Sequence, residues 1–368
     1  MKKVVVGMSG GVDSAVAALL LKRQGYDVVG LFMRNWDSTI NNDVLGNPNL
    51  NNDICPQEGD YNDALKVCEK LDIPLHRIDF VKEYWVYVFT YFLEELKRGR
   101  TPNPDVMCNK YIKFDPFIKE AKRLGAEYIA TGHYARIIDD NLYKAIDENK
   151  DQSYFLCQLT KNQLSNVLFP VGELTKEEVR KIAKDNDLTV ADKKDSTGIC
   201  FIGERNFSEF LKNYLPSKKG KIVNIDTNEE VGIHYGLMNY TIGQRRGLNI
   251  GGNENRLFVV GKNLDKNILY VGLGSDHEAL YSNEAIIEQM NFIDNKKTSK
   301  CKAKFRYRQK DIDVDVEHLD SNEMKVKYSS LKAVTPGQIC CLYDGDECLG
   351  GGIIKEVYKD NKKMVFYN

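Results

Sequence analysis

The fold of this chain is indicated by Gly7-Met8-Ser9-Gly10-Gly11-Val12-Asp13-Ser14, which follows the apolar run Val4-Val5-Val6 and precedes the helical pattern of residues 15–22. This order predicts a strand, a glycine turn and a helix start. Gly10 and Gly11 can adopt backbone angles that other residues avoid, so several N–H groups can converge on one anion at the helix N-terminus. The stretch therefore predicts a phosphate-binding loop, with hydroxyl donors from its serines and Asp13 as a candidate magnesium ligand.

The loop is not a Walker motif, because no lysine stands before Ser14. Transfer of a γ-phosphate is therefore not the expected reaction. Two adjacent glycines alone would also fit a simple strand-to-helix turn. The full string Ser9-Gly10-Gly11-Val12-Asp13-Ser14 resembles the PP-loop of the ATP pyrophosphatases, which cleave ATP between the α- and β-phosphates and leave an adenylated oxygen.

Length and composition set the outer limits. A chain of 368 residues can form two or three domains, and a net charge of -1 means that a nucleic-acid partner would have to be met by local basic patches. The N-terminus lacks the apolar region of a signal peptide and no stretch approaches a membrane span, so we expect no membrane association and a cytoplasmic location. Nine cysteines, an odd number, favour free thiols or a transient disulfide over a disulfide scaffold.

Strand and helix signals alternate through the first two hundred residues. We expect strands at 27–33, 75–80 and 128–130, and helices at 61–71, 84–98 and 114–124. This alternation predicts a doubly wound parallel sheet, and ligands bind at the carboxyl ends of such strands, where the loop, Met33 and Thr131-Gly132-His133 fall.

From about Gly220 the pattern changes to short alternating strands, including 303–307, 313–317 and 325–328, for which a small β-barrel is the simplest arrangement. We expect three domains: an α/β catalytic domain at 1–208, a small central domain at 209–280 and a C-terminal β-barrel at 281–368. The asparagine-rich residues 41–52 are expected to form an exposed, mobile loop.

Two cysteines have surroundings that suit reactive thiols. Cys108 follows Thr101-Pro102-Asn103-Pro104-Asp105, and Cys200 ends a second stretch that resembles a loop. Neighbouring lysines would favour the thiolate at both positions. The alternative for any single cysteine is a small buried apolar residue, which fits Cys68, Cys157, Cys301, Cys340 and Cys341 well.

Further motifs make the resemblance specific to the tRNA-specific 2-thiouridylases, and it covers nearly the whole chain. These motifs are Asn35-Trp36-Asp37, residues 101–114, Ala130-Thr131-Gly132-His133-Tyr134-Ala135-Arg136, residues 150–156, residues 197–203, residues 240–248 and Pro336-Gly337-Gln338. The family replaces the 2-oxo group of the wobble uridine of certain tRNAs with sulfur. The resemblance implies adenylation of that oxygen by ATP, with magnesium, followed by sulfur transfer that gives 2-thiouridine, AMP and pyrophosphate.

The resemblance also implies roles for individual residues. Cys200 would carry sulfur as a persulfide, Cys108 would be its partner nucleophile, and Asp105 would be a general acid or base. ATP would contact Gly7, Met8, Ser9, Gly10, Gly11, Val12, Asp13, Ser14, Met33 and Gly132. Contacts with tRNA would come from Asn103, Pro104, Asp105, His133, Lys150, Asp151, Gln152, Arg306, Tyr307 and Gln338. A sulfur donor, either a cysteine desulfurase or a sulfur-relay protein, and a reductant for the Cys108–Cys200 disulfide would complete the cycle.

No further cofactor is expected. Asp105-x-x-Cys108 lacks the C-x-x-C spacing that would suggest an iron–sulfur cluster. Cys340 and Cys341 are adjacent on an expected strand and would point to opposite faces, which argues against a structural zinc site with Cys348.

Two other functional classes remain open from the residues. The chain could be another ATP pyrophosphatase that adenylates a small carboxylate or carbonyl, although such reactions leave the two cysteine contexts unused. It could also be an RNA-binding protein whose cysteine pair responds to redox state, although binding alone needs no pyrophosphate site. AMP formation that requires tRNA distinguishes the thiouridylase from both.

Overall fold

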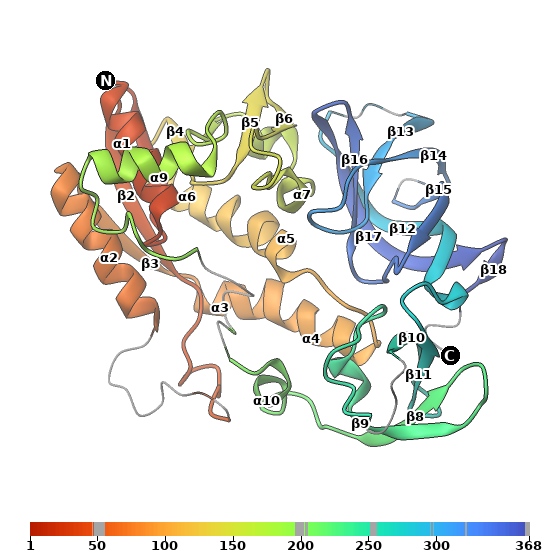
Figure 1. Ribbon diagram of the computed structural model, residues 1–368. Helices are drawn as coiled ribbons and strands as arrows, with labels where there is room; N and C mark the ends of the chain where they lie inside the picture. The colour runs from red at the N-terminus through yellow and green to blue at the C-terminus, as the bar shows by residue number, and fades with distance from the viewer. Residues whose placement is uncertain are drawn as a thin grey trace.

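The computed structural model describes residues 1–45, 47, 56–195, 202, 205–250, 256–294, 296, 298–320 and 322–364. Among them, no helix is long and apolar enough to cross a membrane. The described residues form a parallel sheet, a small central sheet and a β-barrel (Figure 1).

The parallel sheet lies at the N-terminal side of the molecule and has the strand order β3-β2-β1-β4-β7. Its strands are β1 (Lys3–Gly7), β2 (Asp27–Arg34), β3 (Leu75–Asp79), β4 (Tyr128–Ala130) and β7 (Val167–Leu168). Side chains alternate between its faces: Val4 and Val6 belong to one apolar cluster and Val5 to another. Both faces are therefore covered, as the sequence predicted.

Helices pack on each face. The cluster around Val4 and Val6 includes α1 (Val12–Arg23), α2 (Pro56–Leu71) and α9 (Lys176–Asp185). The opposite cluster includes α3 (Val81–Tyr84), the π-helical turn η1 (Trp85–Phe89), α4 (Thr90–Lys97), α5 (Pro104–Cys108), the π-helical turn η2 (Asn109–Lys113), α6 (Pro116–Arg123), α7 (Ser153–Leu156), α8 (Lys161–Leu164) and α10 (Phe207–Leu211). The helix predicted at 84–98 therefore begins three residues earlier and contains a π-helical turn.

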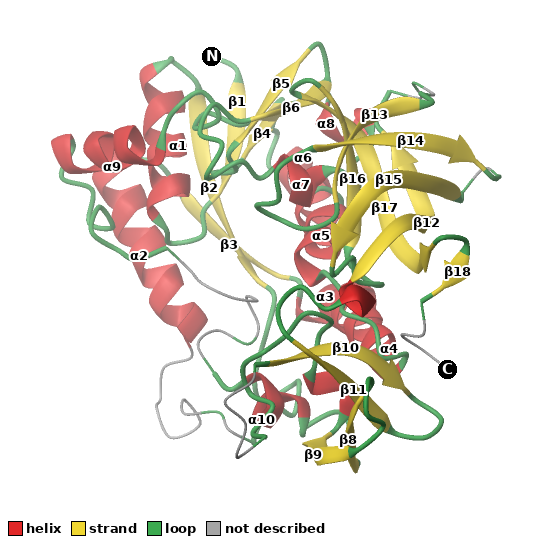
Figure 2. Cartoon of the chain, turned by 45° about the vertical axis from the view of Figure 1, so that its right-hand side comes forward, coloured by secondary structure: helices red, strands yellow, loops and turns green. Residues whose placement is uncertain are grey.

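The central sheet has the order β10-β11-β8-β9. Its strands are β8 (Lys219–Asn224), β9 (Glu230–Tyr235), β10 (Leu257–Asn263) and β11 (Ile268–Leu273), with the short 3-10 helices η3 (Leu237–Asn239) and η4 (Glu278–Leu280) nearby in sequence. In Figures 1 and 2 this sheet and the barrel lie on the side of the molecule away from α1 and α9.

The barrel closes through six strands, because β12 pairs with both β15 and β17. Its strands are β12 (Tyr281–Phe292), β13 (Lys300–Lys304), β14 (Ile312–His318), β15 (Met324–Lys332), β16 (Ile339–Asp344) and β17 (Glu347–Lys359), and β18 (Lys362–Lys363) pairs with the end of β17. The barrel confirms the predicted fold class. The strand predicted at 303–307 is wrong beyond Lys304, where the chain turns through Arg308 at φ 64°.

A hairpin of β5 (Ala135–Ile138) and β6 (Asn141–Lys144) joins the first part of the chain to the barrel. Cys348 of β17 pairs with Leu142 of β6 in antiparallel register. Backbone hydrogen bonds therefore join the barrel to the hairpin that follows β4, and residues of the parallel sheet and the barrel share one apolar cluster.

The expectation of an exposed loop at 41–52 is wrong for two of its described residues. Asn41 is 3% exposed and Asp43 is fully buried. Asp43 accepts a hydrogen bond from the Trp36 indole at 3.0 Å and forms an ion pair with Arg205 at 2.7 Å. This segment therefore fastens the chain near α10 to the region after β2, while Val44 remains exposed.

Candidate active site

The loop between β1 and α1 is held by its own serines. The Ser14 hydroxyl donates to the Gly11 carbonyl at 3.1 Å and lies 3.1 Å from the Ser9 hydroxyl, and it accepts from the Ser9 N–H at 3.2 Å. Gly10 has φ +73°, and a Cβ there would lie 2.2 Å from the Asp60 carbonyl oxygen. Only glycine fits this position without displacing α2.

Three strand ends bring the predicted nucleotide residues together. Met33 lies near the end of β2, beside β1, and Gly132 follows β4 on the other side of β1. A Cβ on Gly132 would lie 2.7 Å from the Asp13 carbonyl carbon and the Ser14 nitrogen, so this backbone rests directly on the loop. Met8 and Val12 are 2% and 3% exposed and belong to an apolar cluster, and the Met8 N–H donates to the Leu31 carbonyl at 3.0 Å.

His133 lies beside this junction. Its Nδ1 is 2.7 Å from the Thr131 hydroxyl, and its ring contacts those of Phe114 and Phe169. Loss of hydration among these rings, together with the nearby Lys113 ammonium, lowers the pKa of His133 well below its ordinary value. We therefore expect a neutral imidazole at pH 7.

The Asp13 carboxylate is held by two residues that the sequence analysis did not single out. Its Oδ1 accepts from the Tyr134 hydroxyl at 2.8 Å and from the Lys176 ammonium at 2.6 Å. Among the described residues, no group of three or more histidine, cysteine, aspartate or glutamate side chains could hold a metal ion. A single carboxylate nevertheless fits magnesium that arrives with ATP, since protein sites for this ion use one or two carboxylates besides phosphate oxygens.

Asp195 extends this network away from the loop. It pairs with Lys150 at 2.7 Å, Lys176 at 2.8 Å and Arg180 at 2.9 Å. Burial alone would raise the pKa of Asp195, but the hydrogen bonds from Lys150 and Lys176 outweigh it and lower the pKa to about 2. No sequence signal could have linked Asp13 to Lys176, because 163 residues separate them.

A second lysine reaches the other side of the loop. Lys193 donates to the Gly10 carbonyl at 3.0 Å and pairs with Asp60 at 2.8 Å and Asp63 at 2.7 Å. Burial alone would lower the pKa of Lys193, yet these two carboxylates raise it. This lysine therefore connects α2 to the loop.

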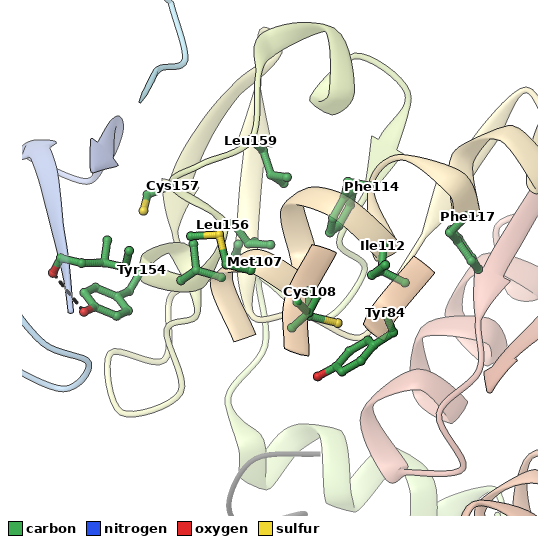
Figure 3. Packing of buried hydrophobic residues seen from close by; sticks show 14 of the residues in the cluster. Tyr84, Met107, Cys108, Ile112, Phe114, Phe117, Tyr154, Leu156, Cys157 and Leu159 are labelled. Atoms are coloured by element: carbon green, nitrogen blue, oxygen red, sulfur yellow. Dashed lines mark hydrogen bonds between the residues drawn. The ribbon is translucent and has the colours of Figure 1, made fainter. Parts of the chain in front are cut away.

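Cys108 differs from the exposed loop thiol that its surroundings suggested. It is the last residue of α5 and is 3% exposed, within the apolar cluster of Tyr84, Met107 and Ile112 (Figure 3). The irregular backbone that the prolines impose ends at Asn103, and the helix begins at the next residue, Pro104. The predicted partner, Cys200, and the rest of the motif at 196–200 lie outside the described residues.

The segment before Cys108 uses its polar groups to begin the helix. Asn103 is 9% exposed and its side chain accepts a hydrogen bond from the Val106 N–H at 3.3 Å, as an N-cap does. Pro104 occupies the first helical turn, where its missing N–H costs nothing. Burial raises the pKa of Asp105, although the Lys113 ammonium opposes the shift.

The residues expected to touch tRNA around the loop have structural partners. Lys150 pairs with Asp195, and Gln152 accepts a hydrogen bond from the Tyr134 N–H at 3.0 Å. Asp151 is 4% exposed and accepts from the Ser153 hydroxyl at 3.0 Å. It is therefore placed to fix the chain at the start of α7.

The expected tRNA contacts of the C-terminal part lie in turns beside the barrel. Arg306 is exposed and donates to the Lys332 carbonyl at 2.7 Å, while the Tyr307 ring lies 4.5 Å from that of Phe155. Gln338 donates to the Thr101 carbonyl at 2.9 Å. Gln338 thus connects the barrel to the stretch that leads to Cys108.

Three lysines on the strands β8 and β13 lie close to carboxylates. Lys221 lies 2.8 Å from Glu230, and Lys304 lies 3.3 Å from the buried Asp151. Lys302 lies 4.0 Å from Asp313. These pairs reduce the positive charge that β8 and β13 present.

The remaining cysteines largely behave as small apolar residues. Cys68, Cys157, Cys340 and Cys341 are at most 1% exposed, as expected, whereas Cys301 is only partly buried. Cys340 and Cys341 belong to different apolar clusters, so their side chains do point to opposite faces of β16.

Three protein-family models together match nearly the whole chain. Residues 2–204 match the tRNA methyl transferase HUP domain, 208–273 the tRNA methyl transferase PRC-barrel domain and 282–354 the aminomethyltransferase beta-barrel domain. A solved 4-thiouridine synthetase–RNA complex with bound ATP is 18% identical, with a TM-score of 0.33 over 53% of this chain and 43% of that chain, a similarity too partial to bear on function.

Full-length relatives are much closer. The chain is 58% identical to the tRNA-specific 2-thiouridylase MnmA of Mycoplasmopsis synoviae, over 99% of this chain and 98% of the relative. It is 58% identical to the protein of the same name from Mesoplasma florum, over 96% and 98%, and 56% identical to that of Mycoplasma capricolum, over 97% and 100%. The chain belongs to the family of tRNA-specific 2-thiouridylases.

Proposed function

We propose that this protein catalyses the ATP-dependent 2-thiolation of the wobble uridine of tRNA, yielding 2-thiouridine, AMP and pyrophosphate. The observation that carries the proposal is the loop at 7–14, which has glycine geometry at Gly10, two serine hydroxyls and no lysine of its own, on a chain 58% identical to named 2-thiouridylases. Such a loop suits pyrophosphate as a leaving group.

The first step we propose is attack of the uridine O2 on the α-phosphorus of ATP, which releases pyrophosphate and leaves the oxygen bonded to AMP. Backbone N–H groups of the loop, with Met33 and Gly132 beside it, would hold the nucleotide. Magnesium bound to the phosphates and Asp13 would offset the negative charge of the departing pyrophosphate. The nearby Lys176 ammonium supports an anionic ligand at this place.

The second step we propose is sulfur transfer. Cys200 would carry a persulfide, and the thiolate of Cys108 would attack its inner sulfur, so that a disulfide forms and the outer sulfur leaves with two electrons as sulfide. That sulfide would attack C2 of the uridine and displace AMP with the original oxygen. Asp105, whose pKa is raised by burial, would exchange the proton at the base.

Partners follow from this chemistry. A cysteine desulfurase or sulfur-relay protein would load Cys200, and a thiol reductant would reopen the disulfide with two electrons. We propose that the target uridine leaves the anticodon stack to reach the site, with tRNA contacts from Asn103, Pro104, Asp105, His133, the 150–152 segment and the turn residues beside the barrel. A reducing compartment such as the cytoplasm would suit the many thiols.

The test is a single-turnover reaction of the protein with ATP, magnesium, sulfide and unmodified tRNA, followed by mass spectrometry of the digested nucleosides. We expect one sulfur on uridine and one AMP per event. Asp13→Ala is expected to lose AMP formation, whereas Cys200→Ser is expected to lose thiouridine while binding tRNA normally. AMP without thiouridine would contradict the thiolation and indicate another acceptor, and formation of neither product would leave only a binding role.

A further inference from the structure

Lys176 is a nearly buried cation at the nucleotide loop. Its side chain is 11% exposed, and its ammonium lies 2.6 Å from Asp13 and 2.8 Å from Asp195. It is the first residue of α9, and its backbone N–H donates to the Asp147 carboxylate at 2.9 Å. Because both backbone and side chain are held, the ammonium has a defined position beside the start of α1.

The carboxylates around Lys176 would keep other partners if its ammonium moved. Asp195 would still be paired with Lys150 and Arg180, and Asp13 would still accept the Tyr134 hydroxyl. Moving this ammonium to a phosphate oxygen therefore leaves neither carboxylate without a donor. Both carboxylates are also partly exposed, Asp13 at 31% and Asp195 at 34%, so the exchange costs little in this network.

Lys193 lacks this freedom. It pairs with Asp60 and Asp63 and also donates to the Gly10 carbonyl. Among the contacts of the described residues, neither Asp60 nor Asp63 has a second cation within 4 Å. Release of Lys193 would therefore leave two carboxylates unpaired and free a loop carbonyl, so it serves the shape of the loop.

We propose that Lys176 is a nucleotide-binding residue, whose ammonium leaves Asp13 and binds the β- and γ-phosphate oxygens of ATP, the part that departs as pyrophosphate. This inference rests on the proposed function. Asp13 would then be available to hold magnesium, whose charge would favour the ammonium at the phosphate rather than at Asp13. The fold thus supplies from α9 the cation that the loop lacks in its own sequence.

The test uses inorganic pyrophosphate, without magnesium or tRNA, titrated into the full-length chain by calorimetry. Lys176→Met should weaken binding by about 10-fold or more, the value of a charge-assisted hydrogen bond to phosphate. The matched control is Lys181→Met, on the same helix, because Lys181 is 73% exposed and pairs only with Asp185 among the described residues. Its affinity should stay within twofold of the wild type. If Lys176→Met does not fold, as judged by near-ultraviolet circular dichroism, Lys176→Gln takes its place.

A double-mutant cycle separates direct binding from mere neutralisation of Asp13. If Lys176 contacts pyrophosphate, the double variant Asp13→Asn/Lys176→Met should bind pyrophosphate about 10-fold more weakly than the single variant Asp13→Asn does. Equal affinity of the double variant and Asp13→Asn would overturn the inference, as would unchanged affinity in Lys176→Met. Binding of no pyrophosphate by the wild type would also overturn it. None of these results decides the proposed function, which stands or falls on thiouridine formation by the wild type.

Discussion

Lys262 of β10 offers a prediction whose size can be worked out. Its side chain is 1% exposed, and its ammonium donates to the carbonyl of Gly99, just after α4, at 2.8 Å. In the described part of the chain, no carboxylate lies within 4 Å of it. Burial therefore lowers the pKa of Lys262 from 10.5 to about 7.

The sign follows from proton binding. Between pH 7 and pH 9 the unfolded chain keeps the proton on Lys262, whereas the folded chain releases it. Because the unfolded state then binds more protons, the free energy of unfolding rises with pH, by at most about 1.4 kcal/mol per pH unit for one group. Half of the folded molecules have already lost the proton at pH 7, so the gain from pH 7 to pH 9 is about 2 kcal/mol.

Urea unfolding at pH 7, 8 and 9, followed by tryptophan fluorescence, measures this gain. The free energy of unfolding of the wild type should rise by about 2 kcal/mol relative to Lys262→Met, which has no group to titrate. The matched control is Lys266→Met, an exposed lysine on the same hairpin, which should follow the wild type at every pH. A wild-type-minus-Lys262→Met difference that stays constant across this range would refute the reasoning.

Three further predictions concern the site and its supports. Asp43→Ala should lower the free energy of unfolding by about 3–5 kcal/mol in urea titrations, because it removes one partner of the buried pair with Arg205; a loss below 1 kcal/mol would contradict this. Gly10→Ala should lower the thermal midpoint of unfolding and abolish AMP formation, because φ at Gly10 is +73° and the new Cβ would meet a backbone carbonyl of α2. The control Gly11→Ala, where φ is -100°, should keep the thermal midpoint of the wild type. The pKa of Asp195 is about 2 when folded, so its contribution to stability is present above pH 4 and is lost as the pH falls from 4 to 2. The stability advantage of the wild type over Asp195→Asn should therefore shrink across that range in acid titrations, and a constant advantage would contradict the assignment.

Local patterns were sufficient for the architecture. The apolar run Val4-Val5-Val6 before a glycine turn predicted a strand, and its residues do divide between the two apolar clusters. The alternation of strands and helices then led to a parallel sheet, and the short strands after Gly220 to a barrel. Such features are predicted from hydrophobic periodicity and turn residues, and both can be recognised within a short stretch of sequence.

Some local inferences were incomplete because burial is not a local property. Asn103 and Asp151 look like exposed polar residues in the sequence, yet each is buried and fixes the backbone of a helix start. The asparagine-rich segment at 41–52 was expected to be an exposed loop, but its Asp43 is buried and pairs with Arg205. Polar composition predicts exposure only where no distant partner compensates the buried group.

The sequence by itself determined the loop, the parallel sheet around it and the barrel, because strands, helices and turns are recognised from regular alternation and turn residues within short stretches of sequence. The tertiary structure alone decided which charges meet at the loop. Asp13 and Lys176 are 163 residues apart in the sequence, and Lys150 and Asp195 are 45 residues apart. A charge carries no periodic signature of its partner, so only the tertiary fold brings these groups together. The packing of α9 beside α1, for example, places Lys176 at Asp13.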